Sequence, residues 1–250
     1  MVIDLCDVPK EKQTYEMCLE SVKYDWAQIK YVRKTSRTQE LRLEAVKQNG
    51  WALKYIKQQT PEICLTAVRN NGDALQFVAE QTPEICLAAV QNSGRALEYV
   101  KEQSLGICLA AVREWGNALQ YVKDQTPELC LEAVQRNGEA LQYVEEQTPE
   151  VCLAAVKQNG HALYFIENKT PEICLIAVKQ DGFALQYIPE QEQTLAIVIA
   201  ALKQNPNSRI ILADKFRKPK VYEAAGYDYK PEDLAPSRSS TERERTEVRH

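Results

Sequence analysis

Apolar residues recur along most of the chain in two short patterns that repeat every 22 residues. In the stretch TPEICLTAVRNNGDALQFVAEQ, the first pattern places Ile63–Leu65, Ala67 and Val68 on one wide helical face, about 200° across at 100° per residue. The second pattern, Asp73–Glu80, predicts a shorter helix. A helix of that length is marginal alone in water, so its stability must come from stacking on neighbouring repeats.

The frame T-P-E-I-C-L-x-A-V-x-x-N-G-x-A-L-Q-Y-V-x-x-Q defines a tandem repeat. Regular copies run from Thr38 to Gln191, and the weaker copy at each end is offset by two residues. Terminal repeats of a stacked array are expected to differ from the others, because they cap it. The repeats begin at Thr14, Thr38, Thr60, Thr82, Ser104, Thr126, Thr148, Thr170 and Thr194.

Each repeat carries signals for the start and end of a helix. Thr60 suits an N-cap, Pro61 suits the first helical position, and Glu62 places a negative charge in the first turn. Gly72 stands where a left-handed C-terminal cap is expected. Glycine fills this slot in seven repeats, at Gly50, Gly72, Gly94, Gly116, Gly138, Gly160 and Gly182.

These signals predict an all-α fold, an α-solenoid of about nine two-helix repeats over residues 14–217. Residues 1–13 form an N-terminal lead in this prediction. Residues 218–250 are predicted to be a flexible, mostly disordered tail, since the chain after Pro231 is charged and nearly free of apolar side chains. Within that tail, Gly226–Leu234 is the first segment we would examine for a docking motif.

A cysteine recurs in the first helix of the repeat, and a metal ladder, a disulfide framework or simple packing could explain it. Equivalent helices should lie about 8–10 Å apart, too far for a disulfide or a shared zinc ion. Cysteine also packs well as a small apolar residue. We therefore interpret the slot as a packing position. Val198 fits that interpretation, whereas Arg42 does not, unless its side chain reaches outward to solvent.

An aromatic residue recurs in the second helix, and tyrosine is twice replaced there by phenylalanine. The ring therefore matters more than the hydroxyl group, which favours stacking in the core. An exposed row of aromatic binding residues remains the alternative. The positions are Tyr31, Tyr55, Phe77, Tyr99, Tyr121, Tyr143, Phe165 and Tyr187.

The residue after the glycine changes in every repeat and begins the second helix. This varied slot is either an unconstrained surface position or a row of side chains that recognise a partner. Trp115 is a large aromatic residue where other repeats carry Asn, Ser or Asp, and an exposed Trp would be a natural binding anchor. The candidate partner-binding residues are Trp51, Asp73, Arg95, Trp115, Asn117, Glu139, His161 and Phe183.

Composition narrows the classes of function. With 31 basic and 35 acidic residues the net charge is −4, whereas a general nucleic-acid or anionic-membrane binder should be basic. The N-terminus shows no secretory signal, and the longest apolar run, Leu195–Leu202, is far shorter than the roughly 20 residues of a membrane span. We expect a cytoplasmic protein with no membrane partner.

Catalysis finds little support in the sequence. The two histidines are His161 and His250, and no repeated Ser, Asp or Cys obviously serves either of them. A reactive thiol should be exposed and electropositive, unlike a cysteine in a core position. Isolated glycines do not form a phosphate-binding loop. We expect no enzymatic activity, no cofactor and no metal.

At these residues the sequence resembles a known repeat. TPEICLAAVQNSGRALEYVKEQ (Thr82–Gln103) and its copies look like the repeats of the domain of unknown function 4116 family. The resemblance covers about Thr14 to Gln191, and Thr194–Phe216 departs from it with Pro206 in the glycine slot. It implies tandem helical repeats of unassigned activity and brings no site residues. The family's occurrence in large DNA viruses, protists and bacteria suggests an effector acting in a host cytoplasm.

These observations favour a non-catalytic scaffold or adaptor that binds another protein, because a solenoid presents equivalent positions at regular spacing over a large surface. The alternative is a reader of single-stranded nucleic acid with one contact per repeat. Asn, Arg and His in the varied slot suit that alternative, and the acidic residues Asp73 and Glu139 oppose it.

Overall fold

The computed structural model describes residues 4–230 and 233, and these form helices without any strand. A regular repeat consists of a ten-residue α-helix followed by a six-residue 3-10 helix. The α-helices are α1 (Tyr15–Tyr24), α2 (Gln39–Gln48), α3 (Pro61–Asn70), α4 (Pro83–Asn92), α5 (Leu105–Glu114), α6 (Pro127–Arg136), α7 (Pro149–Gln158), α8 (Pro171–Gln180), α9 (Leu195–Gln204) and α10 (Pro219–Ala225).

The 3-10 helices of the repeats follow the α-helices in order. They are η3 (Trp26–Lys30), η5 (Gly50–Tyr55), η6 (Gly72–Phe77), η7 (Gly94–Tyr99), η8 (Gly116–Tyr121), η9 (Gly138–Tyr143), η10 (Gly160–Phe165), η11 (Gly182–Tyr187) and η12 (Pro206–Ile211). Short 3-10 turns also occur outside this pattern, at η1 (Leu5–Asp7), η2 (Lys10–Lys12), η4 (Lys34–Ser36) and η13 (Asp214–Phe216).

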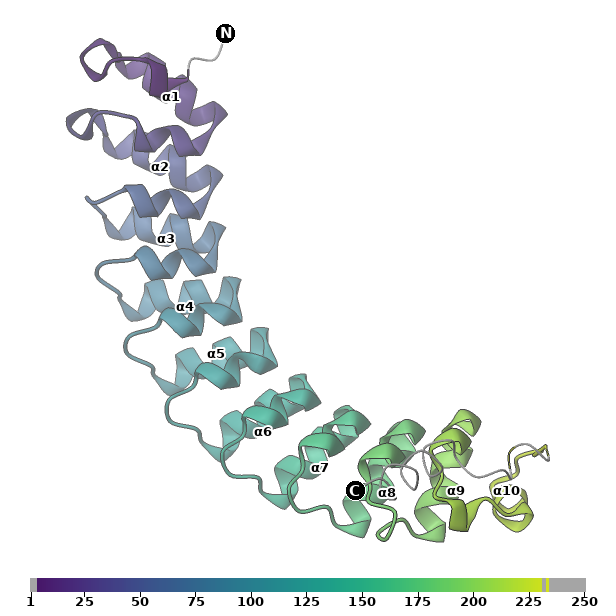
Figure 1. Cartoon of the computed structure of the whole chain (residues 1–250). Coiled ribbons are helices and arrows are strands. Elements are labelled where there is room, and N and C mark those ends of the chain that lie inside the picture. The colour runs from purple at the N-terminus through teal and green to yellow at the C-terminus, as the bar shows by residue number, and fades with distance from the viewer. Residues whose placement is uncertain (1–3, 231–232, 234–250) are drawn as a thin grey trace, which may run out of the picture. The chain divides into compact units, whose positions relative to one another are not determined.

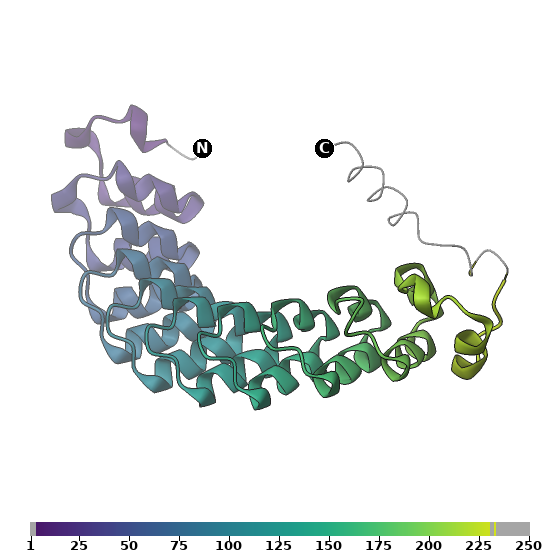
Figure 2. The same cartoon turned by 60° about the horizontal axis from the view of Figure 1, so that its bottom comes forward.

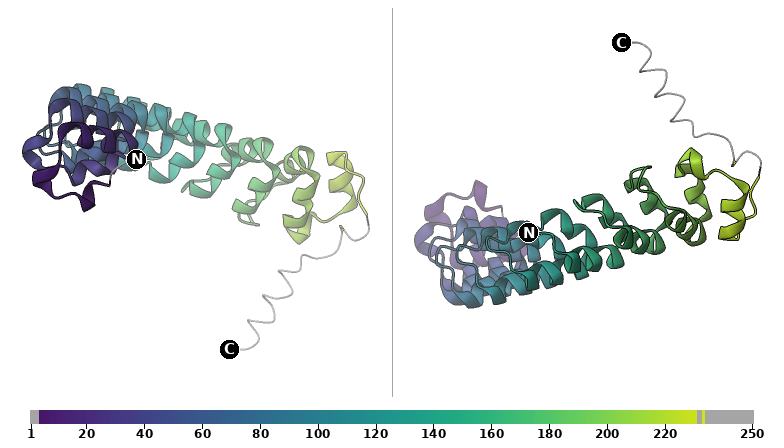
Figure 3. Two further views of the ribbon diagram at one scale, coloured as in Figure 1. Left: turned by 90° about the horizontal axis from the view of Figure 1, so that it is seen from above. Right: turned by 90° about the horizontal axis from the view of Figure 1, so that it is seen from below.

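The chain divides into two compact halves, residues 1–124 and 125–250. Within each half, every α-helix packs on the α-helix of the next repeat, and every 3-10 helix of a repeat packs on the next such 3-10 helix. The result is two layers in each half (Figures 1, 2 and 3). The predicted all-α solenoid is therefore confirmed.

The apolar pattern predicted from the sequence forms the core. In the Thr60 repeat, Ile63, Cys64, Ala67 and Val68 of α3 are buried. Ala74, Leu75 and Val78 from η6 and the residue after it are buried as well. The same positions are buried in the other regular repeats, except that Arg42 is half-buried in the Cys64 position. The two layers therefore pack against each other through these side chains.

The start of each first helix agrees with the prediction. The Thr60 hydroxyl accepts a hydrogen bond from the Ile63 backbone N–H at 3.4 Å, and Pro61 is the first helical residue. A threonine or serine N-cap accepts the equivalent bond in α1 to α9 of the described chain. These caps satisfy a backbone donor that the helix itself leaves without a partner.

The predicted left-handed glycine cap is wrong. Asn71 ends α3 in an extended conformation (φ −149°, ψ 112°), and its side chain caps η6 by accepting from the Asp73 N–H at 3.0 Å. Gly72 is needed for a different reason. A Cβ atom there would lie 2.4 Å from the carbonyl oxygen of Ala89 in the next repeat. Glycine thus permits the close approach of consecutive repeats.

The second helix also differs from the prediction. It covers Gly72–Phe77 rather than Asp73–Glu80, and its bonds are of the 3-10 type, as in Ala74 N–H to Asn71 O at 3.0 Å. It ends because Val78 is extended (φ −75°, ψ 119°) and directs its own side chain into the core. At six residues it is longer than the three or four that most 3-10 helices reach.

The folded array extends into the predicted tail. Helix α10 lies within residues 218–250, and Tyr222 on it is fully buried. Arg217, before α10, donates to the Leu212 and Ile210 carbonyls, as Arg37, before α2, donates to those of Val32 and Lys30. Helix α10 therefore starts a further, shortened repeat that the divergent sequence concealed. Residues 231–232 and 234–250 lie outside the described chain.

Asp233 holds the described end of the suspected docking segment against α10. Its carboxylate accepts from Arg209 Nε at 2.7 Å and from the Lys230 N–H at 2.9 Å, while the Tyr222 hydroxyl donates to its carbonyl at 2.8 Å. The Lys230 N–H, and also Arg209, hold the pKa of Asp233 below its usual value. This part of Gly226–Leu234 is used for packing.

A lowered carboxyl pKa gives stability that is complete above the unfolded pKa of about 3.9 and lost as the pH falls through the folded value. Replacing Asp233 with Asn should therefore destabilise the end of the array by about 1–3 kcal/mol at pH 6. The difference from wild type should shrink below about pH 4. Hydrogen exchange of the Lys230 amide measures this, and an equal difference at pH 6 and pH 2.5 would contradict it.

Candidate binding surface

Seven cysteines of the described chain are buried and none forms a disulfide. Burial raises the pKa of the Cys86 thiol, so it stays protonated near neutral pH. The exposed Cys6 is also held as a thiol, because Asp4 and Asp7 raise its pKa to about 11. The slot in the repeat is a packing position, as the sequence predicted.

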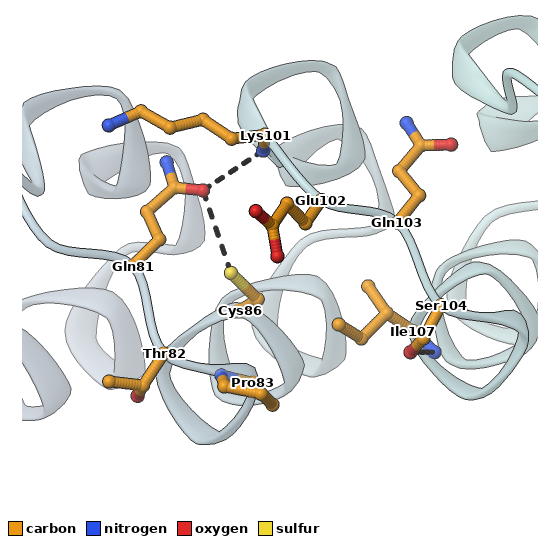
Figure 4. Close-up of a pocket in the computed structure, with 9 residues that line it drawn as sticks. All are labelled: Gln81, Thr82, Pro83, Cys86, Lys101, Glu102, Gln103, Ser104 and Ile107. Atoms are coloured by element: carbon orange, nitrogen blue, oxygen red, sulfur yellow. Dashed lines mark hydrogen bonds between the residues drawn. The ribbon is translucent and has the colours of Figure 1, made fainter.

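In five of the seven regular repeats a glutamine stands directly before the N-cap and joins consecutive repeats, a role that sequence reasoning missed. Gln81 donates through Nε2 to the Tyr99 carbonyl at 2.9 Å and accepts at Oε1 from the Lys101 N–H at 3.0 Å. The Cys86 thiol points at the same oxygen, 3.6 Å away (Figure 4). We call this residue the clasp glutamine. It recurs at Gln59, Gln103, Gln125 and Gln147 with equivalent bonds.

The replacement of the clasp glutamine before Thr170 supports this assignment. Lys169 takes the place of the clasp glutamine and, like any lysine, has no hydrogen-bond acceptor. The residue whose N–H it would otherwise accept is Pro189, which has no N–H. The two substitutions are compatible: Lys169 offers no acceptor, and Pro189 has no N–H group that would need one. The repeated Gln directly before Thr was the signal in the sequence.

A second bridge joins repeats at the opposite end of the first helix. Asn92 accepts from the Gly72 N–H at 2.6 Å and donates to the Arg69 carbonyl at 3.0 Å. Gln158 and Gln180 accept in the same way from Gly138 and Gly160, each at 2.6 Å. Consecutive repeats are therefore fixed to each other at both ends of the first helix, which makes each half a rigid support for its surface side chains.

A recess lies beside each clasp, between one repeat and the next. The recess in Figure 4 has a volume of about 340 Å³ and is lined by Gln81, Pro83, Cys86, Lys101 and Glu102, among others. Equivalent recesses in the two halves measure about 210, 380 and 170 Å³. Among the residues that the structure describes, no group of three His, Cys, Asp or Glu side chains is placed to hold a metal ion.

The varied slot lies on the 3-10 layer, next to the aromatic row. Trp51 is 37% exposed and packs edge-on against Phe77 of the next repeat, with ring centroids 5.4 Å apart. His161 contacts Tyr187 of the next repeat in the same way, at 5.6 Å. These varied side chains and the aromatic rings therefore form one continuous surface where they are in contact.

Several varied side chains also contact the capping residue of the next repeat. Asp73 accepts from the Ser93 hydroxyl at 3.2 Å, and Glu139 accepts from the Asn159 amide at 3.3 Å. Arg95 instead pairs with Glu98 on its own helix, at 3.5 Å. The slot is thus neither unconstrained nor wholly available to a partner, because some of its side chains form hydrogen bonds with the next repeat.

The aromatic row is not a core ladder. All eight of its side chains are half-buried. Trp115 is half-buried too, and it packs on Tyr121 of its own repeat at 6.3 Å rather than on the next repeat. The prediction of core stacking is therefore wrong in part, since the rings are half-buried rather than buried.

The C-terminal half carries the largest aromatic cluster of this surface. Tyr164 is 64% exposed, and its ring lies 5.1 Å from Phe165 and 5.4 Å from Tyr187. His161 bonds to Asp181 through Nε2 at 2.6 Å and to the Tyr187 hydroxyl through Nδ1 at 3.2 Å. The Asp–His–Tyr chain orients the rings, since each hydrogen bond limits rotation of its two side chains.

The predicted residues are divided between the two halves of the chain. Trp51, Asp73, Arg95, Trp115 and Asn117 lie in the N-terminal half, and Glu139, His161 and Phe183 lie in the C-terminal half. Asn117 and Phe183 are half-buried, and Glu139 is exposed. Tyr164 was not among the predicted residues. Its place three residues after the varied slot, where four other repeats have Gln, was the available signal.

The family model described as "Domain of unknown function (DUF4116)" matches the chain in six overlapping segments. They cover residues 38–81, 60–105, 104–148, 126–170, 148–193 and 171–217. The chain belongs to the DUF4116 family. Each match spans about two repeats.

Neither the curated proteins nor the solved structures contain a match to this DUF4116 chain. In the part of the chain that the structure describes, no helix has both the length and the apolar character needed to cross a bilayer.

Proposed function

We infer that this DUF4116 protein is a non-catalytic scaffold or adaptor that binds another protein through its 3-10 layer. The observation that carries the proposal is the aromatic row, half-exposed and flanked by side chains that differ from repeat to repeat. Aromatic residues of this kind, apolar on one side and open on the other, are enriched at protein interfaces.

The hydrogen bonds that join consecutive repeats favour binding at this surface. Within each half, the clasp glutamines and the second bridge join consecutive repeats, so that little conformational entropy is lost when a partner binds. Repeated aromatic rings supply general contact area, and the varied slot supplies selectivity. The surface includes Asp73, Glu139 and Arg95, a mixture of charges that suits a protein partner better than a polyanion.

The most exposed rings should dominate affinity. Changing Trp51 or Tyr164 to Ala should each weaken binding of the protein partner about tenfold or more, because exposed aromatic anchors are typical hot spots. The matched control is Glu84, Gln91 and Lys157 changed to Ala, three exposed positions on the α-helical layer. Affinities of the purified partner measured by interferometry should not change in the control.

The partner can be captured with a photo-crosslinking amino acid placed at position 95, 117 or 139 of the 3-10 layer. The same probe at position 84, 91 or 157 reports on the α-helical layer. The proposal expects a protein adduct from the first set that survives nuclease treatment. Adducts from the second set alone, or adducts that nuclease abolishes, would contradict it.

A further inference from the structure

One recess departs from all its equivalents at two interacting positions. In the Thr60 and Thr82 repeats, the equivalent recess is lined by the clasp glutamine and by the cysteine five residues later. The thiol of that cysteine points at the glutamine oxygen. In the Thr38 repeat both members of this pair are arginine, Arg37 and Arg42. Packing alone did not explain Arg42, and its side chain remains half-buried with a hydrogen bond to Gln58.

Arg37 is anchored rather than mobile. Its guanidinium donates to the Val32 carbonyl at 3.1 Å, to the Tyr55 carbonyl at 2.5 Å and to the Lys30 carbonyl at 3.0 Å. A guanidinium has five N–H donors, so two remain for another acceptor. Arg37 also cannot accept a hydrogen bond from the Lys57 N–H, as a clasp glutamine would. The substitution therefore adds donors and removes an acceptor.

No acidic side chain lines this recess. It has a volume of about 350 Å³ and is formed by Lys34, Arg37, Arg42, Lys54, Tyr55, Lys57 and Gln58. The equivalent recesses each include a carboxylate, from Glu80, Glu102, Glu145 or Glu167. Within the described residues, none of its five cationic side chains forms an ion pair with a carboxylate. This concentration of positive charge stands in a chain whose net charge is −4.

Five positive charges around one recess destabilise the folded chain unless an anion neutralises them. Burial, and then the nearby charge of Arg42, lowers the pKa of Arg37, which means that its charged form is disfavoured at this place. Two arginines and three lysines that line one recess would be stabilised by a ligand that supplies opposite charge and several acceptors.

We propose that the recess at Arg37 and Arg42 is an anion-binding site for a ligand that carries more than one phosphate group. A single phosphate monoester carries about −1.5 to −2 charges near pH 7, less than five cationic side chains can neutralise. The planar guanidinium groups suit phosphate oxygens in a bidentate geometry, and the lysines act as point charges. Tyr55 offers an aromatic surface at the wall for the part of the ligand next to the phosphates.

This site goes beyond the proposed scaffold function. Arg37 and Arg42 are not part of the varied slot, so the two proposals can succeed or fail separately. The phosphates can belong to a free small molecule or to a phosphorylated segment of a partner, and the same chemistry would recognise both.

Calorimetric titration with inorganic pyrophosphate at low salt tests the site. The whole chain should bind one pyrophosphate, and affinity should fall steeply as salt is added. The variant with Arg37→Gln and Arg42→Cys restores the residues of the neighbouring recesses and should fold as they do. It should bind at least about tenfold more weakly, because it loses both guanidinium groups.

The control is Arg69→Gln with Lys157→Gln, which removes the same charge from exposed positions and should keep full affinity. Absence of binding by the wild type, or equal losses in the two double variants, would overturn the proposal. A doubly phosphorylated peptide that binds more tightly than pyrophosphate would identify a partner protein as the source of the phosphates. The reverse order would identify a free small molecule.

Discussion

Changing Gly72 to Ala is expected to destabilise the N-terminal half by about 3 kcal/mol or more. The added Cβ would lie 2.4 Å from the Ala89 carbonyl oxygen and 2.9 Å from the Ser93 Cβ, and the first of these is backbone that cannot rotate away. The neighbouring repeat must move, which strains the bond from Asn92 to the Gly72 N–H. Urea unfolding followed by circular dichroism measures the loss.

Gly106 is the matched control for that substitution. It lies in α5, and a Cβ built there meets no atom within 4 Å. Because Ala favours helix more than Gly does, Gly106→Ala should be neutral or stabilise by up to about 1 kcal/mol. Similar unfolding midpoints for the two alanine variants would refute the idea that glycine sets the approach of the repeats.

Loss of a clasp glutamine is expected to be the second most damaging change. Gln81→Ala would leave the Tyr99 carbonyl and the Lys101 N–H without their partner in a partly buried site. Each lost partner costs about 1–3 kcal/mol where it is fully buried, and because these groups are at most partly buried a total of about 2–4 kcal/mol is expected. Hydrogen exchange at the Lys101 amide should accelerate in step with the loss of stability.

Gln76 serves as the control for this variant. It is exposed and donates only to the Asp73 carbonyl three residues earlier on its own 3-10 helix. Gln76→Ala should therefore change the free energy of unfolding by less than about 0.5 kcal/mol. If Gln81→Ala is equally mild, the two repeats are held together by their apolar contacts rather than by the clasp.

The sequence alone was sufficient for the first helix of each repeat. Thr60 and Pro61 place its start, and Ile63, Cys64, Ala67 and Val68 identify its buried face. These features depend on interactions within four residues along the chain, which a regular helix makes predictable. Repetition strengthened the inference, since each copy repeated the same signals. The burial of the cysteines followed from the same periodicity.

The candidate surface could be predicted only in part. The varied slot was visible as the one position where every repeat differs, and the structure places it on the 3-10 layer. The half-exposed state of the aromatic row was not predictable, because a ring at helical spacing looks the same whether one face or both faces are covered. Tyr164 and the pairing of Arg37 with Arg42 also needed the structure.

The sequence by itself determined the repeat, its length, the N-caps and the apolar face, because these depend on local hydrogen bonds and on periodicity. The tertiary structure decided why the glycine is needed, what the clasp glutamine joins and where the array continues past residue 217. Those properties depend on atoms about 20 residues apart that meet only when consecutive repeats stack. Gly72 shows the difference most clearly. Its sequence context indicated a left-handed cap, whereas the structure shows that the Ala89 carbonyl oxygen of the next repeat leaves no room for a Cβ atom.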